Sequence, residues 1–213
     1  MFKKLRDIVT EHIAKNRNVY LFLLMAFVLG VSAGAFTVNG LSSMQRDELV
    51  NYLQGFLQLH NNHNLESSEL FSTALMENMK LVGLLWILGV TIIGIPFIFI
   101  IITVKGFITG FSSGFIISVL GLKGVLFSTF VLLPKEIIIV PCLIAIGVNG
   151  VNFSLRIAKN SSAHDNFKDS LKSSFISYCF VTAFYSCIIL AGILIDAYFT
   201  PVLIRIIAPA ITL

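Results

Sequence analysis

The sequence has 213 residues, of which 56% are hydrophobic and only 12% are charged, and its mean hydropathy is +0.91. Because soluble domains carry about 25% charged residues, this composition excludes a soluble globular protein and predicts an all-α integral membrane protein. The three cysteines lie in apolar runs without a C-x-x-C pair, so we expect neither a disulfide framework nor a zinc site.

Residues 1–18 are basic and carry a weak apolar helical face, which predicts a short amphipathic segment on the cytoplasmic surface. Anionic membrane lipid accounts for the positive charge, so no nucleic acid partner is expected. Residues 19–38 form the first predicted span, in which Gly30 and Gly34 place two small residues on one helix face. A cleavable signal peptide is the alternative interpretation of this start.

Residues 40–79 form the longest polar segment, and their acidic character favours the extracytoplasmic side. Ser42 and Gln45 match a capping box at the start of a helix. Apolar residues at helical spacing then predict a hairpin of two amphipathic helices, with one stripe at Leu49, Leu53 and Phe56 and another at Phe71, Leu75 and Met79. We interpret the stripes as a docking surface for a partner. The alternative is that they close on each other or lie on lipid.

Four further spans are predicted. The second covers residues 81–104, with a kink at Pro96 and its inner edge at Lys105, and the others cover 106–122, 137–155 and 175–199. With this layout, ten cations flank the inner side and five flank the outer side. The positive-inside rule then predicts a cytoplasmic N-terminus and an extracytoplasmic C-terminus.

Residues 105–156 form the predicted packed centre. Gly106, Gly110, Gly114 and Ser118 recur at every fourth position, which predicts close approach of another helix from the same chain or from a second copy in a homo-oligomer. Helix-breaking or turn residues follow, namely Gly121, Gly124, Pro134, Glu136 and Pro141. Residues 124–133 are too short to span alone, so they either extend the third span or dip back as a re-entrant half-helix. Glu136 is expected at the membrane edge, where it pairs with Lys135 or caps the fourth helix.

The sequence offers few groups for catalysis or metal binding. Residues 110–114 match the G-x-S-x-G nucleophile pattern, but they lie in a predicted helix, and all four histidines fall outside the spans. His60 and His63 lie near Glu66 and Glu69 without the spacing of a common metal site. We therefore expect a protein that is not an enzyme and that uses no cofactor or metal.

Asn149 and Asn152 are polar residues within the fourth span, and such residues are costly in lipid. They either hydrogen-bond to a neighbouring helix or line a polar path for a substrate. The sequence contains no P-loop, so a transporter built from this chain would need another subunit as its energy source.

The central stretch resembles the stage II sporulation protein M family. The resemblance is carried by Lys105-Gly-Phe-x-x-Gly-Phe-x-x-Gly-Phe, Leu122-Lys-Gly, Leu132-Leu-Pro134, Pro141 and Asn152-Phe-Ser154, and by Gly34-Ala-Phe-Thr-Val-Asn39 in the first span. It implies a multi-pass protein in the septal or engulfing mother-cell membrane of a spore-forming bacterium. It also implies a complex with two peptidoglycan-degrading partners, the stage II sporulation proteins D and P, which this protein would anchor during engulfment.

Two functions from different classes are compatible with these observations. The first is a membrane scaffold that holds cell-wall hydrolases through its outer segment. The second is a permease or the membrane subunit of a transporter, with the break at 121–134 as part of the pathway.

Overall fold

The computed structural model describes residues 16–62, 67–160 and 167–211, and within these ranges it is almost entirely helical, without strands. The predictions for residues 1–15 and for the turn at His63 and Glu66 lie outside the described residues. In chain order the elements are α2 (Arg17–Thr37), η1 (Val38–Gly40), α3 (Ser43–Asn62), α4 (Ser67–Gly89), α5 (Gly94–Leu120), α6 (Leu122–Phe127), η2 (Ser128–Leu132), α7 (Leu133–Asn160) and α8 (Phe167–Ile211).

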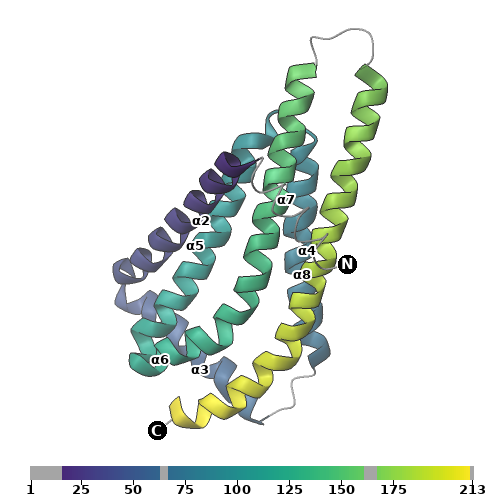
Figure 1. Ribbon diagram of the computed structural model, residues 1–213. Coiled ribbons are helices and arrows are strands. Elements are labelled where there is room, and N and C mark those ends of the chain that lie inside the picture. Colours follow the sequence, from purple (N-terminus) through teal and green to yellow (C-terminus); the bar gives the residue numbers. More distant parts are fainter. Residues whose placement is uncertain (1–15, 63–66, 161–166, 212–213) are drawn as a thin grey trace.

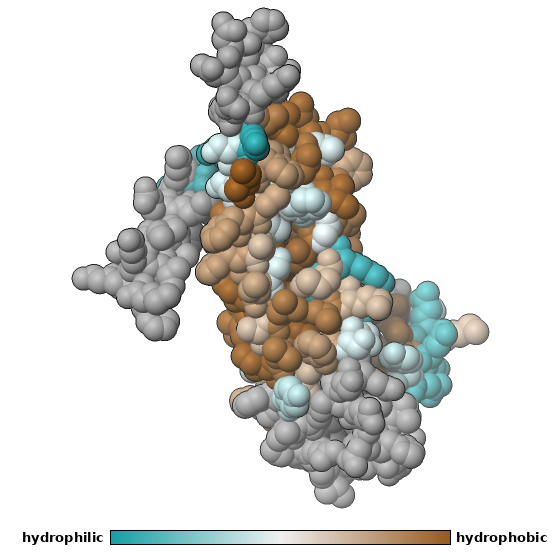
Figure 2. Space-filling view, turned by 90° about the vertical axis from the view of Figure 1, so that its right-hand side faces the viewer, coloured by the Kyte–Doolittle hydropathy of each residue, from teal (hydrophilic) through white to brown (hydrophobic). Residues whose placement is uncertain are grey.

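Five of the described helical segments are long and apolar enough to cross a membrane, which confirms the predicted all-α, five-span fold. They cover Arg17–Gly40, Phe71–Gly89, Gly94–Leu120, Leu122–Ala158 and Leu171–Tyr198. The flank of the bundle is a continuous apolar surface over much of its length, as expected for side chains that face lipid (Figure 2).

The predicted boundary between the second and third spans is wrong. Helix α4 ends at Gly89 and α5 begins at Gly94, so the chain turns at residues 90–93 instead of continuing to Lys105. The hydropathy pattern did not reveal this turn, because the residues of the turn are themselves apolar. Pro96 lies in the first turn of α5 and produces no kink, since a backbone N–H at that position has no partner within the helix.

Both predictions for residues 124–133 are wrong, because these residues neither extend the third span nor form a separate half-helix. Gly121 ends α5 with a φ of 59°, a left-handed conformation that suits glycine, and reverses the chain. Helix α6, the π-helical segment η2 and α7 then follow one another without a gap, so residues 124–133 belong to the fourth span. A π-helical segment keeps the backbone hydrogen-bonded while it shifts the faces of the helix.

The helices form a bundle in which α2 packs along α5, and α7 packs against α8 and α4 (Figure 1). The start of α2, the α4–α5 turn and the adjoining ends of α7 and α8 lie toward one end, which we call the basic end. Helix α3 and the α5–α6 turn lie at the other end, which we call the α3 end. The core runs between the two ends and is centred on buried side chains that include Leu23, Leu85, Ile98, Ile146 and Ile189.

Candidate functional site

Two ion pairs lie between the helices of the bundle. Lys105 Nζ of α5 is 3.1 Å from Glu136 Oε1 of α7, and these side chains are only 17% and 12% exposed. Lys135 Nζ is 3.6 Å from Asp196 Oδ2 of α8, and the aspartate side chain is 13% exposed. Adjacent residues on a helix point in different directions. Lys135 and Glu136 therefore link α7 to α8 on one side and to α5 on the other.

The depth of this charged cluster is unusual for ionised groups. Lys105 is the twelfth residue of α5, which starts at Gly94 and has 27 residues. At about 1.5 Å per residue, it lies roughly 17 Å from the basic end, near the middle of a hydrocarbon layer about 30 Å thick. The two lysines and two acids give the cluster no net charge. Lys105 and Glu136 are partners at a depth where an unpaired charge is very costly, and Lys135 is paired with Asp196 near the end of the fifth span.

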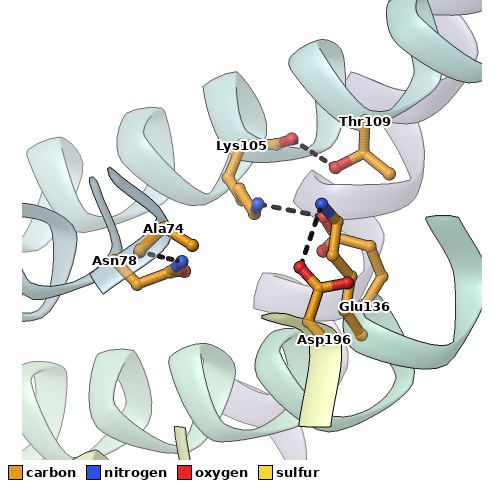
Figure 3. Close-up of polar contacts among 7 residues, drawn as sticks. Ala74, Asn78, Lys105, Thr109, Glu136 and Asp196 are labelled. Carbon is orange, nitrogen blue, oxygen red and sulfur yellow. Dashed lines mark hydrogen bonds and ion pairs between the residues drawn. The ribbon is translucent and has the colours of Figure 1, made fainter. Parts of the chain in front are cut away.

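Hydrogen bonds to the cluster are incomplete. The Thr200 hydroxyl donates to Asp196 Oδ1 over 2.6 Å. Asn78 of α4, which is 8% exposed, donates its amide to the Ala74 carbonyl over 2.8 Å. Its Oδ1 and the second oxygen of Glu136 are buried without a partner in the described structure. Figure 3 shows Lys105 of α5, Glu136 of α7 and Asp196 of α8 pointing toward one another, with Asn78 of α4 to one side.

Three sequence-based placements are corrected by this arrangement. Lys105 lies mid-span and not at the inner edge, because the second span ends 16 residues earlier, at Gly89. Glu136 pairs across to α5 and not with its neighbour, and it caps no free helix end because η2 leads directly into α7. The two ion pairs cross-link α5, α7 and α8, so the cluster holds these three helices in position.

Glycine contacts define the α2–α5 interface. A side chain at Gly30 or Gly34 would collide with the backbone of α5 at Thr103 and Phe107. A side chain at Gly106 or Gly110 would collide with the backbone of α2, and one at Gly114 would meet Ala35 Cα at 3.2 Å. The two helix backbones therefore touch over three turns, within one chain. Close backbone approach of this kind is how helices associate in lipid.

Ser118, the fourth member of the small-residue row, has a different role. It is exposed at the end of α5, where Arg46 Nη2 donates to both its carbonyl oxygen and its hydroxyl over 3.1 Å. The Ser42–Gln45 capping box also forms, with Gln45 Oε1 accepting from the Ser42 backbone N–H over 3.1 Å. Helix α3 is thereby capped at its start and tied to the end of the bundle.

The predicted helix breakers differ in their surroundings. Gly124 packs against the backbone of Ile116 and Ile117, which allows α6 to fold back tightly on α5. Pro134 lines a cavity of about 220 Å³ beside Lys135 and Asp196. Pro141 lies within α7 and lines a separate apolar groove against α2.

Asn149 forms a helix-to-helix contact. Its amide donates to the Tyr178 carbonyl over 3.1 Å and to Thr182 Oγ1 over 3.4 Å, both on α8. Asn152 is half-buried and lines a polar cavity of about 370 Å³ at the basic end of the bundle.

The model of the family described as stage II sporulation protein M matches residues 23–201, which include four of the spans in full, most of the first span, and the charged cluster. The chain belongs to the stage II sporulation protein M family. It is therefore a membrane protein of a sporulation family. Neither the curated proteins nor the solved structures produced a match.

The stripes predicted as a docking surface in this stage II sporulation protein M family member occupy two settings. Phe71 and Leu75 belong to the second span and pack against the core cluster, so they have partners within the bundle. Leu49 and Leu53 of α3 are half-buried, and α3 contacts α8. The side chain of Phe56 lies outside the described part of the chain.

Two residues that join distant parts of this family member, Ser154 and Tyr178, were not assigned these contacts by sequence reasoning. The Ser154 hydroxyl is fully buried and lies 2.8 Å from the carbonyl oxygens of Gly89 and Thr91 at the α4–α5 turn, of which the Thr91 oxygen also accepts from the Gly94 backbone N–H. The Tyr178 hydroxyl donates to the Trp86 carbonyl over 2.8 Å. Both contacts join residues more than sixty positions apart, and no local pattern announces them.

Proposed function

We propose that this protein is a non-enzymatic membrane scaffold that anchors peptidoglycan-degrading partners, the stage II sporulation proteins D and P, at the septal or engulfing membrane. The proposal rests on the exposed apolar side chains of α3. This helix of 20 residues is tied to the end of the bundle by Arg46 and projects Met44 and Tyr52, which are 81% and 77% exposed. An exposed aromatic and a methionine are side chains typical of protein interfaces.

Charge supports an extracytoplasmic position for α3. Apart from Lys80, Lys105 and Lys135, which lie well inside the spans, five cations of the described residues lie toward the basic end and three toward the α3 end. The five are Arg17, Arg156, Lys159, Lys168 and Lys172, and the three are Arg46, Lys123 and Arg205. This bias favours a cytoplasmic basic end. The C-terminus and α3 would then be on the side where peptidoglycan lies.

The internal construction of the bundle also supports a scaffold. The α2–α5 glycine interface and the two ion pairs hold the helices in fixed positions. A rigid support places a docking helix at a constant height above the membrane, which lowers the ordering cost of binding.

A permease or membrane subunit of a transporter is the second candidate, and the charged cluster is the observation that favours it, because intramembrane ionisable residues often mark ion pathways. Its charges are already paired with one another, which favours the scaffold.

One purification distinguishes the two functions. Full-length protein would be isolated under mild detergent from sporulating cells, and its co-purifying proteins would be identified. The scaffold predicts wall-degrading enzymes with large extracytoplasmic domains. Recovery of a cytoplasmic ATPase in stoichiometric amount, without wall enzymes, would support the transporter instead.

A further inference from the structure

A polar cavity of about 370 Å³ lies between α7 and α8 at the basic end of the bundle. Helix α7 contributes Asn149, Asn152 and Arg156, and α8 contributes Ser174 and Ser177. In each helix these residues are three or four positions apart, so each set lies on one face. The two polar faces meet across the cavity.

The cavity lies at the level of the membrane surface. Asn16, at the start of α2, also lines it. Ser154, two residues before Arg156, contacts the carbonyl oxygens of the α4–α5 turn. The start of α2 and the α4–α5 turn therefore lie beside the cavity, which places it at the depth of lipid headgroups and within reach of the aqueous phase.

The lining is rich in unused hydrogen-bond donors. Within the described structure, the side chains of Asn152, Arg156, Ser174 and Ser177 form no hydrogen bond or ion pair with the protein, and no described lining residue is acidic. An arginine presents five N–H donors and no acceptor, and the amide and hydroxyls add further donors. A single fixed positive charge among neutral donors suits an anion with several oxygen atoms.

We propose that this cavity binds a phosphate group, which could be the headgroup phosphate of a membrane phospholipid or a free phosphate from the aqueous phase. Arg156 supplies the charge and a bidentate contact, and Asn152 and the two serines donate to the remaining oxygens. Surface-level basic pockets between membrane helices are suited to lipid headgroups.

The aromatic floor of the cavity connects it to a spectroscopic probe. The rings of Phe153 and Tyr178 stack with centroids 4.7 Å apart, and both residues line the cavity. The Tyr178 hydroxyl donates to the carbonyl of Trp86, the single tryptophan of the chain. The Trp86 ring lies 6.4 Å from that of Phe175, which in turn lies 5.9 Å from that of Phe153. Occupation of the cavity should therefore change Trp86 fluorescence.

The test uses the full chain in detergent, titrated separately with inorganic phosphate and with short-chain phosphatidylglycerol. Binding would be followed by ³¹P NMR line broadening and by Trp86 fluorescence. Arg156→Gln should weaken binding at least about tenfold, because a charged hydrogen-bonding partner is lost. Arg156 is exposed, so the variant should fold normally. Lys172→Gln is the matched control, since Lys172 is an exposed cation of α8 outside the cavity lining.

A response to phosphatidylglycerol alone identifies a lipid headgroup as the source, and a response to both probes identifies a site that also accepts free phosphate. Either result supports the site when Arg156→Gln weakens binding and Lys172→Gln does not. The proposal is overturned if neither probe binds saturably. It is also overturned if Arg156→Gln binds as tightly as the unaltered chain, or if both variants lose affinity equally.

Discussion

The Lys105–Glu136 pair can be broken from one side by Lys105→Met, which keeps the length of the side chain and removes its charge. Glu136 would then be a carboxylate at mid-membrane depth without its partner. Its second oxygen already has no hydrogen bond in the described structure, so the site offers little local compensation. We expect a large loss of stability from this single substitution.

The magnitude follows from the geometry. Across the observed 3.1 Å, and at an effective dielectric constant of about 20, the attraction between the two charges is about 5 kcal/mol. Desolvation of both ions offsets most of that attraction in the intact pair, so the pair itself adds little net stability. Removal of one partner leaves the desolvation of the other uncompensated and should cost about 3–5 kcal/mol.

The assay is the free energy of unfolding measured by titration with a denaturing detergent. Lys80→Met is the matched control, because Lys80 is an exposed lysine of α4 without an ion pair in the described structure. The double variant Lys105→Met with Glu136→Met should recover most of the loss, since both charges are then absent. The reasoning is refuted if Lys105→Met lowers stability no more than Lys80→Met, or if the double variant is less stable than the single one.

Gly110→Leu should lower the free energy of unfolding by at least about 1–3 kcal/mol, because the leucine side chain would collide with the α2 backbone. The control Ile108→Leu, at a lipid-facing position, should change the free energy of unfolding by less than about 0.5 kcal/mol. Equal melting curves for the two variants would contradict the interface. Ser154→Ala should cost about 1–3 kcal/mol by the same detergent titration, since it removes the one buried hydroxyl proton that the Gly89 and Thr91 carbonyl oxygens share, and an unchanged midpoint would count against that contact. In a chain without native cysteines, a single cysteine at position 62 should react with an impermeant reagent from outside the cell and one at position 162 should not, whereas outside labelling at 162 would reverse the topology.

Most of the fold could be predicted from hydropathy and from the spacing of small residues. Five apolar stretches predicted five spans because bilayer thickness sets the length of a helix that must satisfy its own backbone. The glycines at 106, 110 and 114 lie on one helix face, which predicted a closely packed neighbour. In the structure this neighbour is α2, which packs there through Gly30 and Gly34. These signals are local, and a single sequence contains them fully.

The charged cluster was not predicted because the boundary between the second and third spans was placed wrongly. Residues 90–93 are as apolar as the spans beside them, so hydropathy ran unbroken to Lys105 and marked it as an edge. The signal that could have found the pair was present, since Lys105 and Glu136 are opposite charges in adjacent apolar stretches, and such charges need partners. The contacts of Ser154, Tyr178 and Arg46 depend on how distant helix ends meet, which no local pattern encodes.

The scaffold proposal is tested most directly by binding of the wall-degrading partners to α3. Full-length protein in lipid nanodiscs would be titrated with the soluble extracytoplasmic domains of those partners. The double variant Met44→Ser with Tyr52→Ser removes the exposed apolar side chains of α3, and Gln54→Ala is a control at an exposed polar position of the same helix. The account predicts that the double variant loses at least about tenfold in affinity while the control binds normally, as expected for the loss of interface anchors. Unchanged affinity of the double variant would contradict docking on α3, and absence of binding by the unaltered chain would contradict the scaffold itself.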